Sequence, residues 1–118
     1  MLLGLHFILL HVADIEEAAA FYTEKFGLTI EDQNPMFVQF KPGVGGGAVL
    51  ALSQGESKPD AGTELRWFVD NVNATLADLQ ARGVEVVNPL ADEPFGRTCA
   101  IKAPGGYTLY LLQPAQQG

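Results

Sequence analysis

Cysteine and basic residues are scarce in this sequence. Cys99 is the only cysteine among 118 residues, so an internal disulfide is impossible and a reducing, cytoplasmic setting is expected. Lysine and arginine together number 7 against 14 aspartates and glutamates, which gives a formal net charge of −7. Because phosphate backbones need basic patches, this charge argues against a nucleic-acid partner. An acidic surface suits solubility or, through electrostatic steering, a cationic ligand.

The sequence also lacks a hydrophobic run of membrane-spanning length. The opening stretch from Leu2 to Val12 has no basic segment before it, contains His6 and His11, and leads directly into Asp14. A spanning helix needs about 20 apolar residues, and a signal peptide begins with a basic segment. We therefore interpret this stretch as a buried strand and expect no membrane partner.

An internal repeat is the strongest feature that the sequence does contain. Residues 46–54 (GGAVLALSQ) and 105–113 (GGYTLYLLQ) are identical at five of nine positions, at an offset of 59. A second pair of segments, residues 12–15 (VADI) and 69–72 (VDNV), follows the same order at an offset of 57. Two landmarks in the same order predict a duplicated structural unit.

Each half of the repeat is predicted to form a βαβββ unit. The apolar runs 7–12 and 65–69 are typical of buried strands. Asp14 and Asn71 are N-cap residues for the helices that follow, and Gly27 and Gly83 end those helices. Three short strands follow each helix, expected at about 28–32, 36–40 and 48–53 in the first half and at about 84–88, 97–102 and 107–112 in the second.

These units predict a single α+β domain over residues 1–118. Module one spans about 5–53, the linker about 54–62 and module two about 63–114. Eight mixed strands would form an open cup with two helices outside it, because one helix covers only one face of each sheet. The modules would pair within the chain or across a homodimer. The glycine-rich segment 43–47 lacks the Gly-Lys-Ser/Thr ending of a phosphate loop and is expected to be a flexible hairpin.

Three motifs along the chain resemble one known family. They are His11-Val12-Ala13-Asp14-Ile15 running into Ala20-Phe21-Tyr22 and Phe26-Gly27-Leu28, then Pro94-Phe95-Gly96-Arg97, and then Ala103-Pro104-Gly105-Gly106-Tyr107. Together they resemble the vicinal oxygen chelate superfamily, which includes glyoxalases, bleomycin-resistance proteins and extradiol dioxygenases. The resemblance covers nearly the whole chain and implies the glyoxalase/bleomycin-resistance fold. Ala103 and Gly105 stand where the family's turn motif has two aspartates.

The resemblance also implies where a metal would bind. Metal-using members place ligands on the first and last strand of each half, and the repeat maps these positions onto Phe7, Ala51, Glu64 and Tyr110. Only Glu64 is a good ligand for a divalent metal, whereas a catalytic site needs about three protein ligands. His6 should point to the opposite face from position 7, unless a bulge turns it inward. We therefore expect no cofactor; the alternative is Zn, Ni, Mn or Fe bound by a relocated ligand set around Glu64 and His6.

Strand alternation assigns a set of side chains to the expected cup. The resemblance to the family adds Thr98 from the penultimate strand and Phe95 from the second motif, so that the candidate ligand-binding residues are Phe7, Leu9, His11, Ala51, Ser53, Glu64, Arg66, Phe68, Phe95, Thr98 and Tyr110. A mostly apolar, partly aromatic set with a few polar groups is typical of a small-molecule site, and aromatic faces favour planar or cationic ligands. Glu64 would pair with a cation unless Arg66, two residues away on the same face, neutralises it.

This set favours a binding protein over an enzyme. The leading hypothesis is a metal-independent, homodimeric protein similar to the bleomycin-resistance branch, which sequesters an antibiotic or another aromatic or cationic compound. No catalytic residue is assigned, because Cys99 is expected to point away from the cup and no Ser-His-Asp arrangement is present. The alternatives are a metal-dependent glyoxalase-type lyase or isomerase or an extradiol dioxygenase, and an interaction module without a small ligand.

Overall fold

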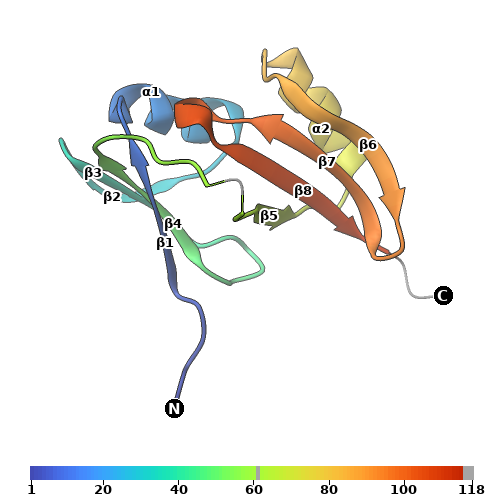
Figure 1. The fold of residues 1–118 in the computed structure, drawn as a ribbon, viewed down its shortest axis with the longest axis horizontal. Helices are drawn as coiled ribbons and strands as arrows, with labels where there is room; N and C mark the ends of the chain where they lie inside the picture. The colour runs from blue at the N-terminus through green and yellow to red at the C-terminus, as the bar shows by residue number, and fades with distance from the viewer. Residues whose placement is uncertain (61, 116–118) are drawn as a thin grey trace. The chain divides into compact units, whose positions relative to one another are not determined.

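The chain divides into two compact units between Lys58 and Pro59 in a computed structural model, which describes residues 1–60 and 62–115. This boundary falls inside the linker expected at 54–62, of which residue 61 lies outside the described residues. Each unit is a four-stranded mixed sheet with one helix, so the predicted α+β fold of two βαβββ modules is confirmed (Figure 1). No helix in the described part of the chain is both long and apolar enough to cross a membrane.

The two modules have the same strand order and the same strand directions. The first sheet is ordered β1-β4-β3-β2 and the second β5-β8-β7-β6; in each, the first pair is parallel and the other two pairs are antiparallel. Module one contains β1 (Phe7–Val12), α1 (Ile15–Ala20), a π-helical turn (Phe21–Lys25), β2 (Ile30–Asn34), β3 (Phe37–Phe40) and β4 (Val49–Gln54). Module two contains β5 (Leu65–Phe68), α2 (Val72–Ala81), β6 (Val86–Glu93), β7 (Gly96–Lys102), a 3-10 turn (Pro104–Gly106) and β8 (Thr108–Pro114).

The first helix begins as predicted but does not continue as an α-helix. Asp14 Oδ1 accepts a hydrogen bond from the Glu17 N–H at 3.0 Å, as an N-cap residue does. After six residues α1 gives way to the π-helical turn. Thr23 Oγ1 donates to the Ala19 carbonyl oxygen at 2.9 Å, and this side-chain bond competes with the backbone bond that an α-helix would form there. Gly27, at φ 85°, follows the turn, consistent with its expected role as a stop.

The glutamine shared by the two repeat sequences links strand and helix in both modules. Gln54 Oε1 accepts a hydrogen bond from the Ile15 N–H at 3.0 Å, and Gln113 Oε1 accepts one from the Val72 N–H at 2.9 Å. Ile15 and Val72 are the first residues of α1 and α2, so their N–H groups have no acceptor within the helix. The repeat therefore preserves a partner for the same backbone donor in both halves.

The core of each module lies between its sheet and its helix. In module one the Tyr22 ring packs on the Phe40 ring, with centroids 5.6 Å apart. In module two α2 buries Val72, Leu76 and Leu79, and Asn71 caps it by accepting from the Ala74 N–H. The largest fully buried side chains are Tyr22, Phe40, Leu52, Ile101, Leu109, Leu111, Val12 and Val72.

Two strand predictions need correction. The strand expected at about 84–88 runs from Val86 to Glu93 and includes Pro89. Because β6 is the edge strand of its sheet and carries register shifts, the missing N–H of proline costs it no ladder bond. The strand expected from Leu2 to Val12 begins only at Phe7. Its partner β4 starts at Val49, whose N–H donates to the His6 carbonyl oxygen, so the residues before His6 have no strand to pair with.

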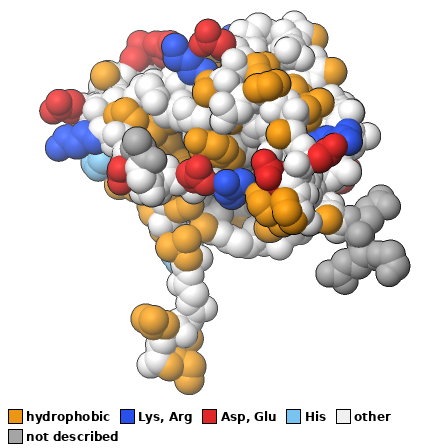
Figure 2. Space-filling model, turned by 45° about the vertical axis from the view of Figure 1, so that its right-hand side comes forward, with side chains coloured by type: hydrophobic (Ala, Val, Ile, Leu, Met, Phe, Trp, Pro, Cys, Tyr) orange, Lys and Arg blue, Asp and Glu red, His pale blue; other side chains and the backbone are white. Residues whose placement is uncertain are grey.

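The residues before β1 are exposed rather than buried. Leu2 and Leu3 are 98% and 94% exposed, and Figure 2 shows a projecting segment with hydrophobic side chains at the free N-terminal end of module one. The glycine-rich segment 43–47 is the predicted hairpin between β3 and β4, closed by a bond from the Gly46 N–H to the Gly43 carbonyl oxygen.

The Pro94-Phe95-Gly96-Arg97 motif holds the second sheet together. Gly96 has φ 151°, and a Cβ at this position would lie 2.2 Å from the Gln113 carbonyl oxygen, so only glycine allows β7 to approach β8 this closely. Arg97 Nε donates to Asp92 Oδ1 at 2.7 Å, and its Nη1 donates to Asn73 Oδ1 at 3.1 Å. The arginine therefore joins the β6–β7 hairpin to the start of α2.

Candidate functional site

Each sheet has one face against its helix and an opposite face, which we call the distal face. In module one, the bonds of Gln54 to α1 and the contact of Phe40 with Tyr22 identify the helix side. In module two, the bonds of Gln113 and Arg97 to α2 identify it. Since successive side chains alternate along a strand, the register of each ladder then assigns the remaining residues to the two faces.

The distal face of module one carries the five candidate residues that the sequence placed in this half. Phe7, Leu9 and His11 on β1 pair with Val49, Ala51 and Ser53 on β4. Ser53 and Ala51 pair in turn with Phe37 and Gln39 on β3. The ladder therefore places these five residues on the same sheet face, as the alternation of side chains along the sequence predicts. His6 precedes β1 and is not part of this ladder.

Aromatic and aliphatic side chains dominate the distal face of module one. The Phe7 and Phe37 rings are parallel within 2°, with centroids 6.4 Å apart. Phe7 is 36% exposed and Leu9 is 42% exposed. Parallel, partly exposed rings offer a planar molecule a surface for stacking. Phe37 was not among the candidate residues predicted from the sequence. Alternation along the strand expected at 36–40 would have placed it on this face.

The distal face of module two carries four candidate residues on its strands. Arg66 and Phe68 on β5 pair with Tyr110 and Leu112 on β8, and Leu112 pairs with Thr98 on β7. The Arg66–Tyr110 pair repeats the Leu9–Ala51 pair of module one at the offsets of 57 and 59 that the sequence shows. Matching backbone positions therefore carry different chemistry in the two halves.

Trp67 and Cys99 lie on the helix side, as alternation predicts. Both pair with Leu111, which is fully buried. Burial raises the pKa of the Cys99 thiol, because a thiolate is poorly solvated there. A buried thiol with a raised pKa is a weak nucleophile, so Cys99 supplies no reactive group to the distal face.

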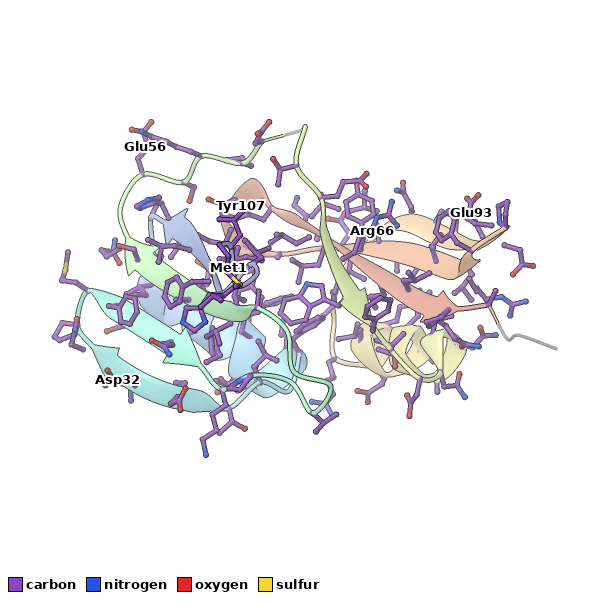
Figure 3. The ribbon with its side chains drawn as sticks, turned by 90° about the horizontal axis from the view of Figure 1, so that it is seen from below. Met1, Asp32, Glu56, Arg66, Glu93 and Tyr107 are labelled. Carbon is purple, nitrogen blue, oxygen red and sulfur yellow. The ribbon has the colours of Figure 1, made fainter. Side chains whose placement is uncertain are left out.

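The strongest polar cluster on the distal face of module two surrounds Arg66 (Figure 3). Arg66 Nη2 is 2.8 Å from Glu64 Oε1. The Arg66 Cζ atom lies 5.3 Å from the centroid of the Tyr110 ring and 5.8 Å from that of the Phe95 ring, both within the range of a cation–π contact. Glu64 immediately precedes β5, and Phe95 lies in the turn between β6 and β7. The structure thus brings four candidate residues of this module together.

The residues at the superfamily's metal positions do not fit a metal ion. Phe7 and Ala51 have no donor atom, and Tyr110 is a poor ligand while it stays protonated. Glu64, the one carboxylate of the four, is in an ion pair with Arg66. Across residues 1–60 and 62–115, no three histidine, cysteine, aspartate or glutamate side chains gather as a metal site requires.

Comparison with protein families identifies the fold family directly. The family model of the Glyoxalase/Bleomycin resistance protein/Dioxygenase superfamily matches residues 4–111. The chain belongs to this superfamily. The resemblance inferred from the three sequence motifs is therefore confirmed, and the matched residues include all three motifs. No curated protein matches the chain.

Solved structures of superfamily members are similar over nearly the full chain. TnmS3, described as an antibiotic binding protein from Streptomyces sp. CB03234, is 27% identical with a TM-score of 0.80, and the match covers 97% of this chain and 98% of that one. A glyoxalase/bleomycin resistance protein from the same organism is 28% identical with a TM-score of 0.74, covering 93% and 100%. A lactoylglutathione lyase from Agrobacterium tumefaciens, at 21% identity with a TM-score of 0.75 and coverage of 95% and 94%, is similar in fold.

Proposed function

We propose that this superfamily member is a metal-independent binding protein that sequesters a small aromatic compound, with an antibiotic as the leading candidate. One observation carries the proposal. Of the four positions that would hold a metal, two lack any donor atom, and the only carboxylate, Glu64, is paired with Arg66. Sequestration needs affinity and an apolar surface but no reactive group.

The distal faces supply such a surface. Phe7 and Leu9 in module one are partly exposed, and Phe68 and Phe95 in module two are 79% and 51% exposed. Large apolar side chains exposed together on a sheet face favour a binding role. The similarity to TnmS3, an antibiotic binding protein, supports a compound of that class.

We also propose a cytoplasmic homodimer as the working form. The single cysteine suits a reducing compartment, and a second copy would cover apolar surface that one chain leaves exposed. Sedimentation velocity at micromolar concentration tests the dimer, and a monomeric chain that still binds its ligand would remove it from the proposal.

A thermal-shift screen tests the function. The protein is purified without a metal-affinity tag, treated with a chelator, and screened against antibiotics with planar aromatic groups, against bleomycin, and against Zn, Ni, Mn and Fe salts. At a free concentration of 100 times Kd, a ligand stabilises the native state by about 2.7 kcal/mol, which corresponds to a rise in Tm of about 10 °C for a domain of this size. We expect an aromatic antibiotic to produce this shift with and without the chelator.

Two variants locate the binding. Phe7→Ala should weaken binding of that antibiotic about tenfold, because an aromatic anchor is lost. Val44→Ala is the matched control, since Val44 is a fully exposed apolar residue in the β3–β4 loop, and it should leave binding unchanged. Stoichiometric metal in the untagged protein would favour the metal-dependent enzyme, and a panel without any stabilising compound would favour an interaction module.

A further inference from the structure

We propose that Arg66 is a specificity-determining residue, and that the aromatic compound it selects carries a carboxylate or another anionic oxygen. This inference deepens the proposed function and rests on it. It assigns a negative charge to the ligand, whereas the acidic net charge of the chain favours a cationic one.

The guanidinium of Arg66 is held in place but is not saturated. Among the described residues, its only hydrogen bond is the one from Nη2 to Glu64 Oε1, and its side chain is 41% exposed. An arginine carries five N–H donors in one plane. Several donors of Arg66 therefore remain available on the distal face of module two.

Three separate elements fix the orientation of this group. Glu64 precedes β5, Tyr110 lies directly opposite Arg66 on β8, and Phe95 projects from the β6–β7 turn. Contacts from three elements restrict the rotamers of a long side chain before any ligand arrives, which reduces the entropy cost of binding. A planar, oriented guanidinium is the arrangement that recognises a carboxylate through two parallel hydrogen bonds.

The neighbouring rings specify the remainder of the ligand. Phe95 is half exposed, and Tyr110 shares the same sheet face with the fully buried Ala100. A flat aromatic body can lie against such rings while its acidic substituent reaches Arg66. The cluster thus matches a planar aromatic acid in both shape and charge.

A cationic ligand fits this cluster less well. Its natural partner is Glu64, but the Arg66 guanidinium already lies 2.8 Å from that carboxylate, so an incoming ammonium group would have to displace it. At physiological salt, charges contributing to the net charge of −7 are largely screened where they lie beyond the Debye length of about 8 Å, whereas the Arg66–Glu64 pair acts at contact distance. The contact at the cluster therefore decides the preference, and Glu64 acts as a positioning residue.

Three naphthalene probes of similar size separate these possibilities. They are 2-naphthoate, 2-naphthalenemethanol and 2-naphthylmethylammonium, which share the aromatic body and carry an anionic, a neutral and a cationic substituent at the same ring position. Affinities for the full chain are measured by fluorescence titration at physiological salt. We expect naphthoate to bind about tenfold more tightly than the alcohol, the increment of one charge-assisted hydrogen bond, and the ammonium compound to bind most weakly.

Variants then assign the preference to Arg66. Arg66→Gln should weaken naphthoate binding about tenfold and leave the alcohol unchanged, whereas Arg66→Lys, which keeps the charge without the planar fork, should recover only part of the loss. Arg82→Gln removes the same charge from an exposed ion pair on α2 and is the matched control. Glu64→Gln should strengthen naphthoate binding severalfold, because the amide oxygen of glutamine can still accept from Arg66 Nη2 and keep it in position, while the negative charge that repels the carboxylate of the ligand is removed.

The outcomes distinguish this inference from the proposed function. If the wild-type protein binds the alcohol or the ammonium compound at least as tightly as naphthoate, the anion preference is wrong while small-molecule binding stands. Loss of ammonium binding in Glu64→Gln with unchanged naphthoate binding would make Glu64 a cation site and overturn the role given to Arg66. If none of the three probes binds, the role given to Arg66 is wrong, and the thermal-shift screen with antibiotics decides the proposed function separately.

Discussion

Module one and module two share their backbone plan but differ on their distal faces. On the helix side, Gln54 and Gln113 bind equivalent N–H groups at the starts of α1 and α2. On the distal side, the Leu9–Ala51 pair of module one occupies the place that Arg66 and Tyr110 occupy in module two.

The difference shows which parts of a duplicated unit are free to diverge. Residues between sheet and helix must fill a close-packed space and satisfy the backbone donors of the helix, so substitution there costs stability. Distal side chains have no such partner within their own module. They are aromatic and aliphatic around Phe7 in one half and charged around Arg66 in the other.

The largest effect is expected from a glycine that module two needs and module one lacks. Gly96→Ala places a Cβ 2.2 Å from the Gln113 carbonyl oxygen at φ 151°, so β7 must move away from β8. We expect the free energy of unfolding to fall by about 3 kcal/mol or more, measured by urea denaturation.

Gly45→Ala in the β3–β4 hairpin is the control for Gly96→Ala. Nothing lies within 4 Å of a Cβ at Gly45, so its stability should change by less than about 0.5 kcal/mol. Equal effects of the two substitutions would show that β7 and β8 do not approach each other as closely as described.

A smaller, matched effect is expected from the two repeat glutamines. Gln54→Ala and Gln113→Ala each leave a helix N-terminal N–H without its side-chain acceptor, which should lower the free energy of unfolding by about 1 kcal/mol in either module. Gln54→Ala should cost somewhat more, because it also removes the Nε2 donor to the Ala13 carbonyl oxygen. Gln80→Ala, at an exposed position of α2, controls for the loss of a glutamine. If only one of the two variants lowers the free energy of unfolding, the two glutamines do not have equivalent roles in the two modules.

The smallest effect concerns an ion pair that only module two has. The hydrogen bond and positive charge of Arg97 hold the pKa of the exposed Asp92 carboxyl below its usual range. A depressed carboxyl pKa stabilises the fold above the unfolded-state value, and this contribution is lost as pH falls through the folded-state pKa. Asp92→Asn should therefore lower the urea midpoint slightly at about pH 7 and leave it unchanged at about pH 2.

A control in module one isolates the contribution of Arg97. Asp32→Asn removes an exposed carboxylate from β2, in a module whose sequence contains no arginine. If both aspartate variants respond to pH in the same way, the Asp92 effect is one of net charge and the ion pair contributes nothing.

Much of the architecture was predictable because its signals are local in the chain. The duplication, the caps Asp14 and Asn71, and the helix ends at Gly27 and Gly83 depend on residue types and spacings of a few positions. Strand alternation also grouped the candidate residues of each strand on the sheet face where the ladder has them, since side chains alternate along a strand whatever strand it pairs with.

Features that depend on partners distant in the chain were not predictable in this way. The length of β6 despite Pro89 depends on its being an edge strand, which no local pattern reveals. The change from α1 to the π-helical turn is not visible in the local pattern either, because Thr23, whose hydroxyl donates to the Ala19 carbonyl oxygen, is compatible with a continued α-helix.

The amino-acid sequence alone indicated the family, revealed the repeat and determined which residues occupy the four positions where metal-using members place their ligands, because each of these depends only on residue types and their order. Only the tertiary structure decided the state of Glu64 and Arg66. Their pairing, and the contacts of Arg66 with Tyr110 and Phe95, require β5, β8 and the β6–β7 turn to meet. Ion pairs and cation–π contacts act over a few ångströms. Arg66, Phe95 and Tyr110 are far apart in the sequence, and only folding brings them within that distance.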